Sequence, residues 1–531
     1  MRVVFRVDAS NAIGTGHIKR CHTLATSLQK RGAQIHFITR AHLGHMGDML
    51  ARDNFAVTLL PQPSGNIKTG ANYAAWLGVT QQEDAAQTIT ALGSQQSDWL
   101  VVDHYGLDRV WEARLRPHTQ RMMVIDDLAN RPHDCDVLLD QNYTDGGQER
   151  YQALVPVNCR LLLGPRYALL RAEYAQYRET LAPRTGKINR VMVYMGGSDH
   201  TNITGMVLAA LSADKLAHID VDVVIGPNFP QKDAVTTQSN ARGRTHIHSS
   251  RPHLADLMAK ADLAIGGGGA TTWERMSLGL PSIVVAIAEN QGPACKALDA
   301  SGLIRFLGNA SKLDTGSFQK AIFKALSETE NLRALSRSNQ NIVDGLGASR
   351  VIEVLDPSPI TNLKLRQATP SDALTYFTWV NDPKVRSNAI TKNPILMQNH
   401  LKWFNERIRD TQSDLFVLEA GNLPVGQIRF ERHGEEVVVD YSLDVLVRGR
   451  GWGKQLIKMG VEALKPNTRG ILKATVKEKN ISSVKALIQG GFKEEKSDTP
   501  NGYRHFQLFL QSTETPGKDC HAISKSSLVK K

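Results

Sequence analysis

The first part of the chain alternates short apolar runs with stretches in which apolar residues recur at helical spacing. An apolar, β-branched run over residues 2–7 comes first, and helical spacing follows over residues 18–28. Further apolar runs cover residues 35–39, 99–103, 122–126, 137–139 and 161–163. Alternating strands and helices are typical of a parallel sheet covered by helices. This part of the chain therefore predicts a Rossmann-like α/β domain, which we place at residues 1–180.

The alternation begins again near residue 190 and predicts a second Rossmann-like domain, which we place at residues 181–355. Apolar runs predict strands at residues 191–195, 221–225, 263–265 and 281–287. Helical spacing is found between them at residues 202–211 and 254–259. Ligands of parallel sheets bind beyond the carboxyl ends of the strands. In the first domain, the candidate ligand-binding residues at strand ends are Asp8, Asp103, His104, Tyr105, Asp126, Asp127, Gln141 and Asn142. A single acidic residue after a strand is more often a helix cap than a ligand-binding residue.

The last third of the chain has a different pattern. A segment rich in Pro and Ser at residues 356–359 predicts a linker. Beyond it we expect a strand at 363–368, helices at 372–380 and 400–409, and antiparallel strands at 415–419, 425–431 and 436–443. The polar, basic residues 513–531 are predicted to be a disordered tail. The predicted fold class is α/β, with two Rossmann-like domains followed by an α+β domain at residues 361–512.

Length and composition indicate the number of domains and the cellular compartment of the protein. A chain of 531 residues is too long for one core and predicts about three domains. No signal peptide precedes the first strand, and no apolar run approaches the roughly 20 residues of a membrane span. The five cysteines form no C-x-x-C pair, which fits reduced thiols. We expect a cytoplasmic protein without membrane insertion.

The net charge of +12 favours anionic partners. Basic residues do not cluster with interleaved aromatics, so small phosphorylated ligands are favoured over nucleic acid. No carboxylate cluster indicates a metal, and Cys520 with His521 does not make a metal site. The sequence leaves the oligomeric state open.

The turn after the first strand contains the sequence GTGH, from Gly14 to His17. A strand that ends in such a turn and opens a helix presents free backbone N–H groups and the positive end of the helix dipole at one point. Gly14 and Gly16 allow close approach of an anionic ligand, and His17 is the side chain of the turn that titrates near neutral pH. The alternative is an ordinary glycine-rich turn with a solvated histidine.

A second glycine-rich turn, GGGGATTWE at residues 266–274, follows a predicted strand of the second domain. Each glycine adds entropy to the unfolded chain, so four in a row are better explained by a phosphate that presses on the turn than by packing. Glu274 falls in the first turn of the next helix, where a carboxylate is favoured and can accept hydrogen bonds from ribose hydroxyls. The next strand delivers Asn290 and Gln291 to the same edge.

The two α/β units resemble the two-domain nucleotide-sugar fold called GT-B, and residues 266–291 resemble its UDP-binding half. The motifs RVDAS, GTGH, VVDHYGLD, IDDL, DQNY, LLGPRYALLR and MGGSD, in that order, resemble the UDP-sugar hydrolases of pseudaminic acid biosynthesis. That resemblance implies water attack at the anomeric carbon with inversion. It places His17 near the sugar and diphosphate as the catalytic residue. The implied substrate-binding residues are Asp8, Gly14, Gly16, Tyr105, Ser198, Gly268, Gly269, Thr271, Thr272, Glu274, Asn290 and Gln291.

In the last domain, residues 447–454 read VRGRGWGK between a strand and an amphipathic helix. An R-x-x-G-x-G turn of this kind forms a pyrophosphate cradle from backbone N–H groups. Together with Asn480 and the preceding antiparallel strands, it resembles the GCN5-related N-acetyltransferases. The resemblance implies acetyl-CoA bound by Arg448, Gly449, Gly451, Trp452, Gly453, Lys454 and Asn480.

One position departs from that acetyltransferase pattern. Many members carry a tyrosine seven residues after the asparagine, as general acid to the leaving thiolate, and this chain has Leu487 there. Positioning supplies much of the rate of such a transfer, so activity need not be lost. Tyr441 and Tyr503 are the alternative acids.

The resemblances predict an enzyme with two activities. One is hydrolysis of UDP-2,4-diacetamido-2,4,6-trideoxy-β-L-altropyranose to UDP and free sugar. The other is acetyl-CoA-dependent N-acetylation of the preceding UDP-4-amino-sugar. The alternatives are a UDP-sugar glycosyltransferase fused to a protein N-terminal acetyltransferase, and an acetyltransferase domain that is degenerate and regulatory.

Overall fold

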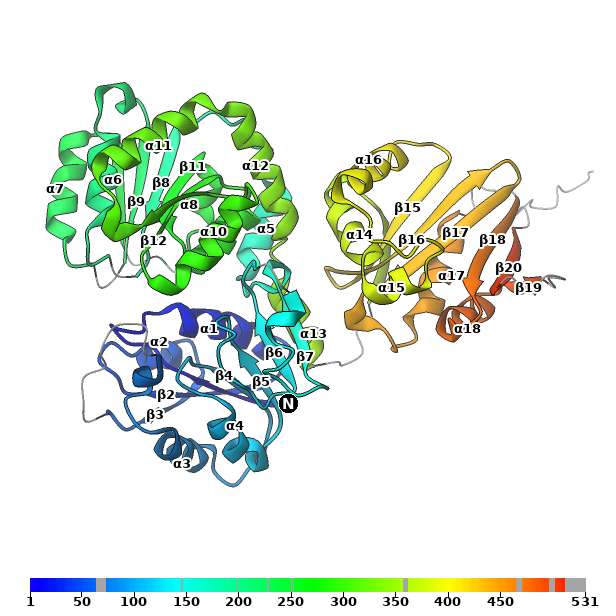
Figure 1. The fold of residues 1–531 in the computed structure, drawn as a ribbon, viewed down its shortest axis with the longest axis horizontal. Helices are drawn as coiled ribbons and strands as arrows, with labels where there is room; N and C mark the ends of the chain where they lie inside the picture. The colour runs from blue at the N-terminus through cyan, green and yellow to red at the C-terminus, as the bar shows by residue number, and fades with distance from the viewer. Residues whose placement is uncertain are drawn as a thin grey trace, which may run out of the picture. The chain divides into compact units, whose positions relative to one another are not determined.

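The computed structural model describes residues 1–63, 73–144, 147–197, 199–226, 229–249, 251, 253–356, 362–464, 470–495 and 502–510. The chain divides into two compact units, Met1–Pro357 and Ser358–Lys531 (Figure 1). The predicted tail, residues 357–361 of the linker region and Ser198 lie outside the described residues. None of the helices in the described part of the chain combines the length and apolar character needed to cross a membrane.

The first unit begins with a seven-stranded parallel sheet in the order β3-β2-β1-β4-β5-β6-β7. Its strands are β1 (Arg2–Val7), β2 (Gln34–Arg40), β3 (Ala56–Leu60), β4 (Ser97–Asp103), β5 (Thr119–Ile125), β6 (Val137–Asp140) and β7 (Arg160–Leu163). The connecting helices are α1 (Gly16–Gln29), α2 (Gly47–Arg52), α3 (Gln81–Leu92) and α4 (Arg109–Leu115). β1 and β4 are almost continuously buried, as expected for strands with helices on both faces.

A six-stranded parallel sheet follows, in the order β10-β9-β8-β11-β12-β13. Its strands are β8 (Arg190–Tyr194), β9 (Asp220–Ile225), β10 (Thr245–Ser249), β11 (Leu263–Gly267), β12 (Ser282–Ala286) and β13 (Arg305–Asn309). The helices of this part are α5 (Ala172–Thr180), α6 (Ile203–Leu211), α7 (Lys232–Arg242), α8 (Ala255–Lys260), α9 (Thr271–Ser277), α10 (Gly292–Ala300), α11 (Thr315–Ser327) and α12 (Thr329–Ile342).

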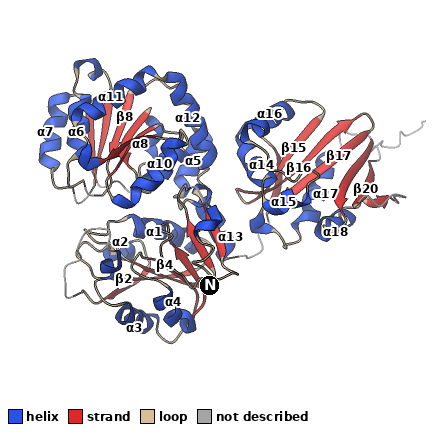
Figure 2. Ribbon diagram, viewed as in Figure 1, coloured by secondary structure: helices blue, strands red, loops and turns tan. Residues whose placement is uncertain are grey.

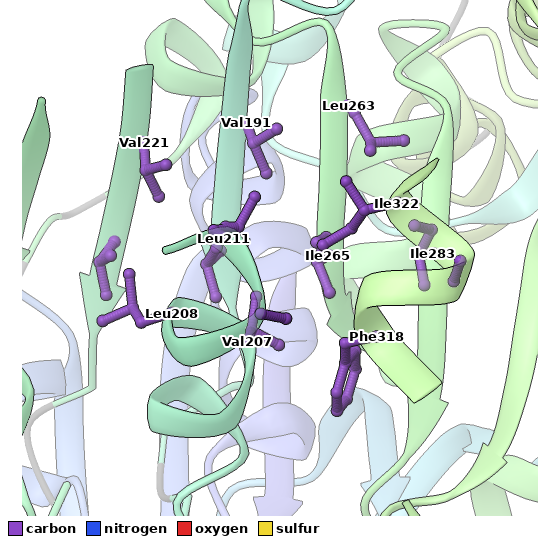
Figure 3. Packing of buried hydrophobic residues seen from close by; sticks show 14 of the residues in the cluster. Val191, Val207, Leu208, Leu211, Val221, Leu263, Ile265, Ile283, Phe318 and Ile322 are labelled. Atoms are coloured by element: carbon purple, nitrogen blue, oxygen red, sulfur yellow. The ribbon is translucent and has the colours of Figure 1, made fainter. Parts of the chain in front are cut away.

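Helices α6 and α11 pack on one face of this second sheet. Figure 3 shows Leu211 of α6 and Phe318 and Ile322 of α11 against the strand residues Val191 and Ile265. All five side chains are fully buried. Burial of each such side chain contributes about 1.5–3 kcal/mol, so the glycine-rich turns at the strand ends rest on a rigid base.

The last helix of the first unit, α13 (Gly347–Leu355), returns to the first sheet. The indole Nε1 of Trp99 in β4 donates a hydrogen bond of 2.8 Å to the carbonyl oxygen of Leu355. Helix α13 also packs against α1, and Arg31 at the end of α1 pairs with Glu353 at 2.6 Å. Although α13 follows the second sheet in sequence, it contributes to the core of the first.

The second unit is a seven-stranded sheet in the order β14-β15-β16-β17-β18-β20-β19, with helices packed against it. Its strands are β14 (Leu363–Gln367), β15 (Ser413–Ala420), β16 (Leu423–His433), β17 (Glu436–Leu443), β18 (Gly470–Lys477), β19 (Lys493–Glu495) and β20 (Tyr503–Leu510). Its helices are α14 (Ala373–Val380), α15 (Pro383–Asn388), α16 (Met397–Arg407), α17 (Trp452–Leu464) and α18 (Ile481–Gln489). All pairs are antiparallel except β17 with β18.

The predicted fold class is confirmed (Figure 2). Strands β18, β19 and β20 of the second unit are not named in the sequence analysis. In the two parallel sheets, the strands that it does not name are β3, β10 and β13, and each lies at the edge of its sheet. Each is half exposed along its length, so it lacks the continuous apolar run of a central strand.

Candidate functional site

The GTGH turn is shaped by its own backbone and by Ser10. The Ser10 hydroxyl accepts hydrogen bonds from the backbone N–H groups of Ala12 and Ile13, at 3.2 and 2.9 Å. Gly14 adopts a left-handed backbone with φ +82°, which glycine tolerates best, and a Cβ atom there would meet nothing within 4 Å. Helix α1 begins at Gly16, so His17 lies in its first turn. The space above the turn is open to a ligand.

His17 is held by Asp103, the last residue of β4. The Nδ1 atom of His17 lies 2.6 Å from Oδ1 of Asp103. Arg20, one turn further along α1, donates to both oxygens of the same carboxylate at 2.7 Å each. Burial raises the pKa of Asp103, but the charge of Arg20 and the hydrogen bonds from Arg20 and His17 outweigh burial and hold the pKa well below its usual range. An ionised Asp103 accepts the Nδ1 proton and leaves Nε2 as the basic nitrogen of the ring.

Aromatic rings surround His17 on the first domain. Tyr105 packs edge-on against His17 with ring centroids 4.6 Å apart, and Trp76 lies at 6.4 Å. Tyr73 contacts both Trp76 and Tyr105, at 4.9 and 5.1 Å. The Tyr105 hydroxyl donates to Asp127 at 2.6 Å, and burial followed by the Asp127 charge raises its pKa well above the usual value. Tyr105 is therefore a neutral donor that is already engaged.

Asp8 lies in a buried network of charged side chains. Its carboxylate pairs with Arg6 at 2.6 Å and accepts the backbone N–H of Arg40 at 2.7 Å. Arg6 and Arg40 both also pair with Asp84 at 2.6 Å, and all four side chains are fully buried. The structure thus places Asp8 inside a buried ion-pair network, with no exposed surface for a ligand.

The turn after β8 faces the GTGH turn. A Cβ atom built on Gly197 would lie 3.5 Å from the hydroxyl oxygen of Thr15. Gly196 has φ +106°, and Asp199 caps α6 by accepting the backbone N–H groups of Ile203 and Thr204 at 3.0 and 2.7 Å. Two turns from different sheets therefore meet at the carboxyl ends of their strands, through Gly197 and Thr15.

The four glycines at residues 266–269 have two different causes. A Cβ atom on Gly266 would meet the Tyr194 carbonyl oxygen at 2.6 Å, on Gly267 the Ile287 side chain at 2.8 Å, and on Gly268 the Cys295 sulfur at 2.3 Å. Internal packing therefore requires the first three, contrary to the expectation that a ligand explains them better. Gly269 has open space, with only the Gln291 amide at 3.6 Å. Only Gly269 remains as a glycine that a ligand would explain.

The predicted UDP-binding side chains of this turn are partly engaged. Thr272 is buried and accepts a hydrogen bond of 3.0 Å from Arg275, which also approaches Thr271 at 3.4 Å. Burial lowers the pKa of Arg275 to about 10. Gln291 accepts the backbone N–H of Ile287 at 3.0 Å, and Asn290 is exposed. Of these predicted side chains, the groups that remain for a ligand are Thr271, Asn290 and the Gln291 amide nitrogen.

Glu274 lies in the first turn of α9. Burial raises its pKa, while the Tyr174 hydroxyl bond and then the Lys19 charge oppose that rise. Lys19 belongs to α1, the helix that carries His17. The carboxylate predicted to accept ribose hydroxyls already accepts the Tyr174 hydroxyl.

In the second unit, β17 and β18 diverge after three paired positions, from Glu436 opposite Ile471 to Val438 opposite Lys473. Past this point, the β17 edge facing β18 has no strand partner up to Leu443 among the described residues. An extended ligand fits such an edge, because it supplies the missing backbone partners.

The predicted pyrophosphate turn follows β17. Gly449 and Gly451 have φ +85° and +77°, are exposed, and leave open space where a Cβ atom would sit. Arg448 is engaged with the carbonyl oxygen of Leu443 at 3.0 Å and with Asp382 at 2.9 Å. Trp452 is buried at the start of α17. The turn therefore offers backbone N–H groups more than the Arg448 side chain.

The other predicted acetyl-CoA residues lie on α17 and α18. Lys454 is exposed, and a Cβ atom on Gly453 would lie 3.3 Å from that of Ala486. Asn480 caps α18, with Oδ1 3.3 Å from the Ser483 backbone N–H and Nδ2 3.0 Å from its hydroxyl. Leu487 is fully buried in α18.

Sequence reasoning missed several residues that the fold brings to His17. Asp103 is named in the sequence analysis only as one of several polar residues at strand ends, and neither Arg20 nor Trp76 is named there. The spacing of His17 and Arg20, one helical turn apart, was a usable signal. No group of three or more His, Cys, Asp or Glu arranged to hold a metal ion is found among the described residues.

Comparison with known proteins gives two family matches. Residues 191–342 match the glycosyltransferase family 28 C-terminal domain, and residues 362–493 match the acetyltransferase (GNAT) domain. A UDP-2,4-diacetamido-2,4,6-trideoxy-beta-L-altropyranose hydrolase of Campylobacter jejuni is 23% identical over 55% of this chain and 93% of its own. The spore coat polysaccharide biosynthesis protein SpsG of Bacillus subtilis is 24% identical over 67% of this chain and 98% of its own.

Other relatives cover different lengths. An uncharacterized protein of Methanocaldococcus jannaschii is 21% identical over 94% of this chain and 98% of its own. Among solved structures, MurG of Acinetobacter baumannii aligns with 67% of this chain and 99% of its own, at 14% identity and a TM-score of 0.47. A spermidine N-acetyltransferase of Vibrio cholerae, in complex with CoA and spermine, aligns with 28% of this chain and 95% of its own, at 17% identity and a TM-score of 0.26. The predicted resemblances are confirmed: this chain joins a glycosyltransferase-28-like region to a GNAT acetyltransferase domain.

Proposed function

We propose that the first unit hydrolyses a UDP-sugar of the 2,4-diacetamido-2,4,6-trideoxy-β-L-altropyranose type. The observation that carries this proposal is the His17–Asp103 pair at the opening of the GTGH turn, opposite the turn at Gly197. A histidine whose Nδ1 proton is fixed by an ionised carboxylate presents a basic Nε2, as water activation requires. The 23% identity to a named hydrolase of this substrate supports the choice of sugar.

In this mechanism His17 activates the water, and the glycine turns stabilise the leaving diphosphate. Nε2 of His17 takes a proton from water while the water oxygen bonds to the anomeric carbon. The bond from that carbon to the diphosphate oxygen breaks, its electron pair leaves with UDP, and the configuration inverts. The exposed N–H groups of the turns and the start of α1 stabilise the charge of the departing diphosphate. UDP is a good leaving group, so no strong acid is needed.

The test is incubation of the protein with the UDP-sugar and no acceptor. We expect stoichiometric release of UDP and free sugar. UDP release that begins only when an acceptor is added would instead support a glycosyltransferase. His17→Ala should lower turnover by at least about tenfold while UDP binding survives. His22→Ala on the same helix is the control, because His22 pairs with Asp53 instead.

We propose that the second unit transfers an acetyl group from acetyl-CoA to the amine of a UDP-4-amino-sugar, which makes the substrate of the first unit. The open edge of β17 and the turn at Gly449 and Gly451 support binding of an extended coenzyme with a pyrophosphate. The amine nitrogen bonds to the acetyl carbon and loses a proton. The carbon–sulfur bond breaks, its electron pair leaves with sulfur, and coenzyme A departs as a thiolate that takes up a proton. Mass spectrometry of the product tests this, with a gain of one acetyl group expected.

Two outcomes would point to the alternatives for the second unit. Acetylation of a ribosomal peptide in preference to the amino-sugar nucleotide would support a protein N-terminal acetyltransferase. Absence of any acetyl-CoA consumption, together with retained binding of CoA, would support a regulatory module.

A further inference from the structure

The gap between β17 and β18 is bridged at its open end by a short helix. Asp382, which caps the start of α15, pairs with Arg448 in the turn after β17 at 2.9 Å. At the other end of α15, Nζ of Lys477 donates to the carbonyl oxygens of Ser387 and Ala389 at 3.0 and 2.7 Å. Lys477 is the last residue of β18. Helix α15 is therefore tied to both strands that border the gap.

The segment that follows α15 is held through its backbone. Arg386 donates to the carbonyl oxygen of Thr391 at 3.2 Å. The amide group of Asn381 accepts the N–H of Ile395 at 2.8 Å and donates to its carbonyl oxygen at 3.0 Å. Two apolar side chains of the segment are largely exposed, with Ile390 at 78% and Leu396 at 68%. A fixed backbone that displays apolar side chains is suited to contact a ligand.

We propose that Lys477 is a positioning residue for the acceptor of acetyl transfer. By fixing Ser387 and Ala389, where residues 387–396 begin at the open end of the gap, it sets the rim against which the amine-bearing substrate binds. Ile390 and Leu396 give that rim an apolar surface, which suits an amino sugar with a deoxy, methyl-bearing edge. This inference rests on the proposed acetyltransferase function, because it needs the thioester to lie in the gap and the amine to reach it from the open end.

The substitution Lys477→Met tests this role, because it removes both hydrogen bonds and keeps the aliphatic stem. Lys473→Met is the matched control. Lys473 lies on the same strand, and its Nζ bonds a single partner, Glu436, at 2.6 Å at the paired end of the strands. A purely structural effect of losing a lysine from β18 would appear in both variants.

Two measurements on the full chain decide the inference. Hydrogen exchange of the amides of residues 387–396 should be faster by at least about tenfold in Lys477→Met and unchanged in Lys473→Met. The KM for the UDP-4-amino-sugar should rise by at least about fivefold in Lys477→Met, while the KM for acetyl-CoA stays within about twofold.

Equal hydrogen-exchange rates of residues 387–396 in the two variants would show that Lys477 does not anchor this segment. Faster exchange with an unchanged acceptor KM, or equal rises in both KM values, would overturn the positioning role. Acetyl transfer by the unmodified protein tests the proposed function separately. Should that transfer be absent, the positioning role falls with it, while the exchange comparison still decides whether Lys477 anchors the segment.

Discussion

Nδ1 of His17 and Oδ1 of Asp103 lie 2.6 Å apart, although 86 positions separate the two residues in the sequence. They meet because β4 is the neighbour of β1, with Asp103 directly opposite Val7, the last residue of β1. Arg20 then fixes the carboxylate from the same helix that carries His17. The first prediction follows from this pair.

Asp103→Asn should lower turnover of the UDP-sugar by at least about tenfold with little change in UDP affinity. The amide presents an N–H group to the imidazole and no longer selects the tautomer with a basic Nε2. Steady-state hydrolysis and calorimetric binding of UDP measure the two effects. Asp53→Asn is the control, since Asp53 forms an equally short contact of 2.7 Å with His22 on the same helix. Normal turnover in Asp103→Asn would contradict the proposed role of the pair.

Gly449→Ala with Gly451→Ala should weaken coenzyme A binding by at least about tenfold. Each alanine disfavours the left-handed backbone by about 1 kcal/mol, and the added methyl groups cover the N–H groups of the turn. Gly434→Ala is the control, because Gly434 also has a positive φ, +65°, and open space at its Cβ, but lies in the β16–β17 hairpin. Calorimetry with coenzyme A separates the variants. Equal loss of affinity in all of them would show a general strain effect.

Tyr441→Phe should reduce kcat for acetyl transfer by at least about tenfold and leave the KM for acetyl-CoA nearly unchanged. Tyr441 lies where β17 still pairs with β16 but no longer with β18. Its hydroxyl donates to the carbonyl oxygen of Ser483 at 3.3 Å, beside Asn480. Burial raises its pKa to about 12, so it carries its proton at neutral pH and can donate it to a thiolate. Tyr503→Phe should have no such effect. The reverse pattern would assign the acid to Tyr503.

Asp84→Asn should destabilise the folded protein by about 3–5 kcal/mol, because Arg6 and Arg40 then remain buried with one carboxylate between them. Trp111 also donates to Asp84, at 3.0 Å, and would keep that contact with the amide oxygen. Urea unfolding measures the change. Glu330→Gln, at an exposed pair with Arg333, should leave the unfolding curve in place. A similar small shift in both variants would mean that the buried network contributes little.

The same network predicts how stability depends on pH. Burial raises the pKa of Asp84, but its pairing with Arg6 outweighs burial and lowers the pKa below its usual value. The stabilisation is therefore fully present above about pH 4, the unfolded-state pKa, and is lost as the pH falls through the lower folded-state pKa. The free energy of unfolding should decline below about pH 4, and less steeply in Asp84→Asn. Parallel declines in the two proteins would contradict this assignment.

The sequence by itself determined the alternation of strands and helices, the glycine turns at the strand ends, and the acetyltransferase turn from Arg448 to Lys454. Each of these depends on periodicity or backbone freedom within about ten residues, so it can be read locally. The sequence also predicted His17 as a candidate site residue, because a titratable side chain at a helix start is a local feature.

The tertiary structure decided which groups meet. It paired His17 with Asp103, buried Asp8 in an ion-pair network, assigned Gly266 to Gly268 to internal packing, and returned α13 to the first sheet. It also bonded Lys477, at the end of β18, to the carbonyl oxygens of Ser387 and Ala389 at the end of α15. These relationships depend on strand order and on contacts between residues far apart in the chain, and no local pattern encodes the order in which strands pair.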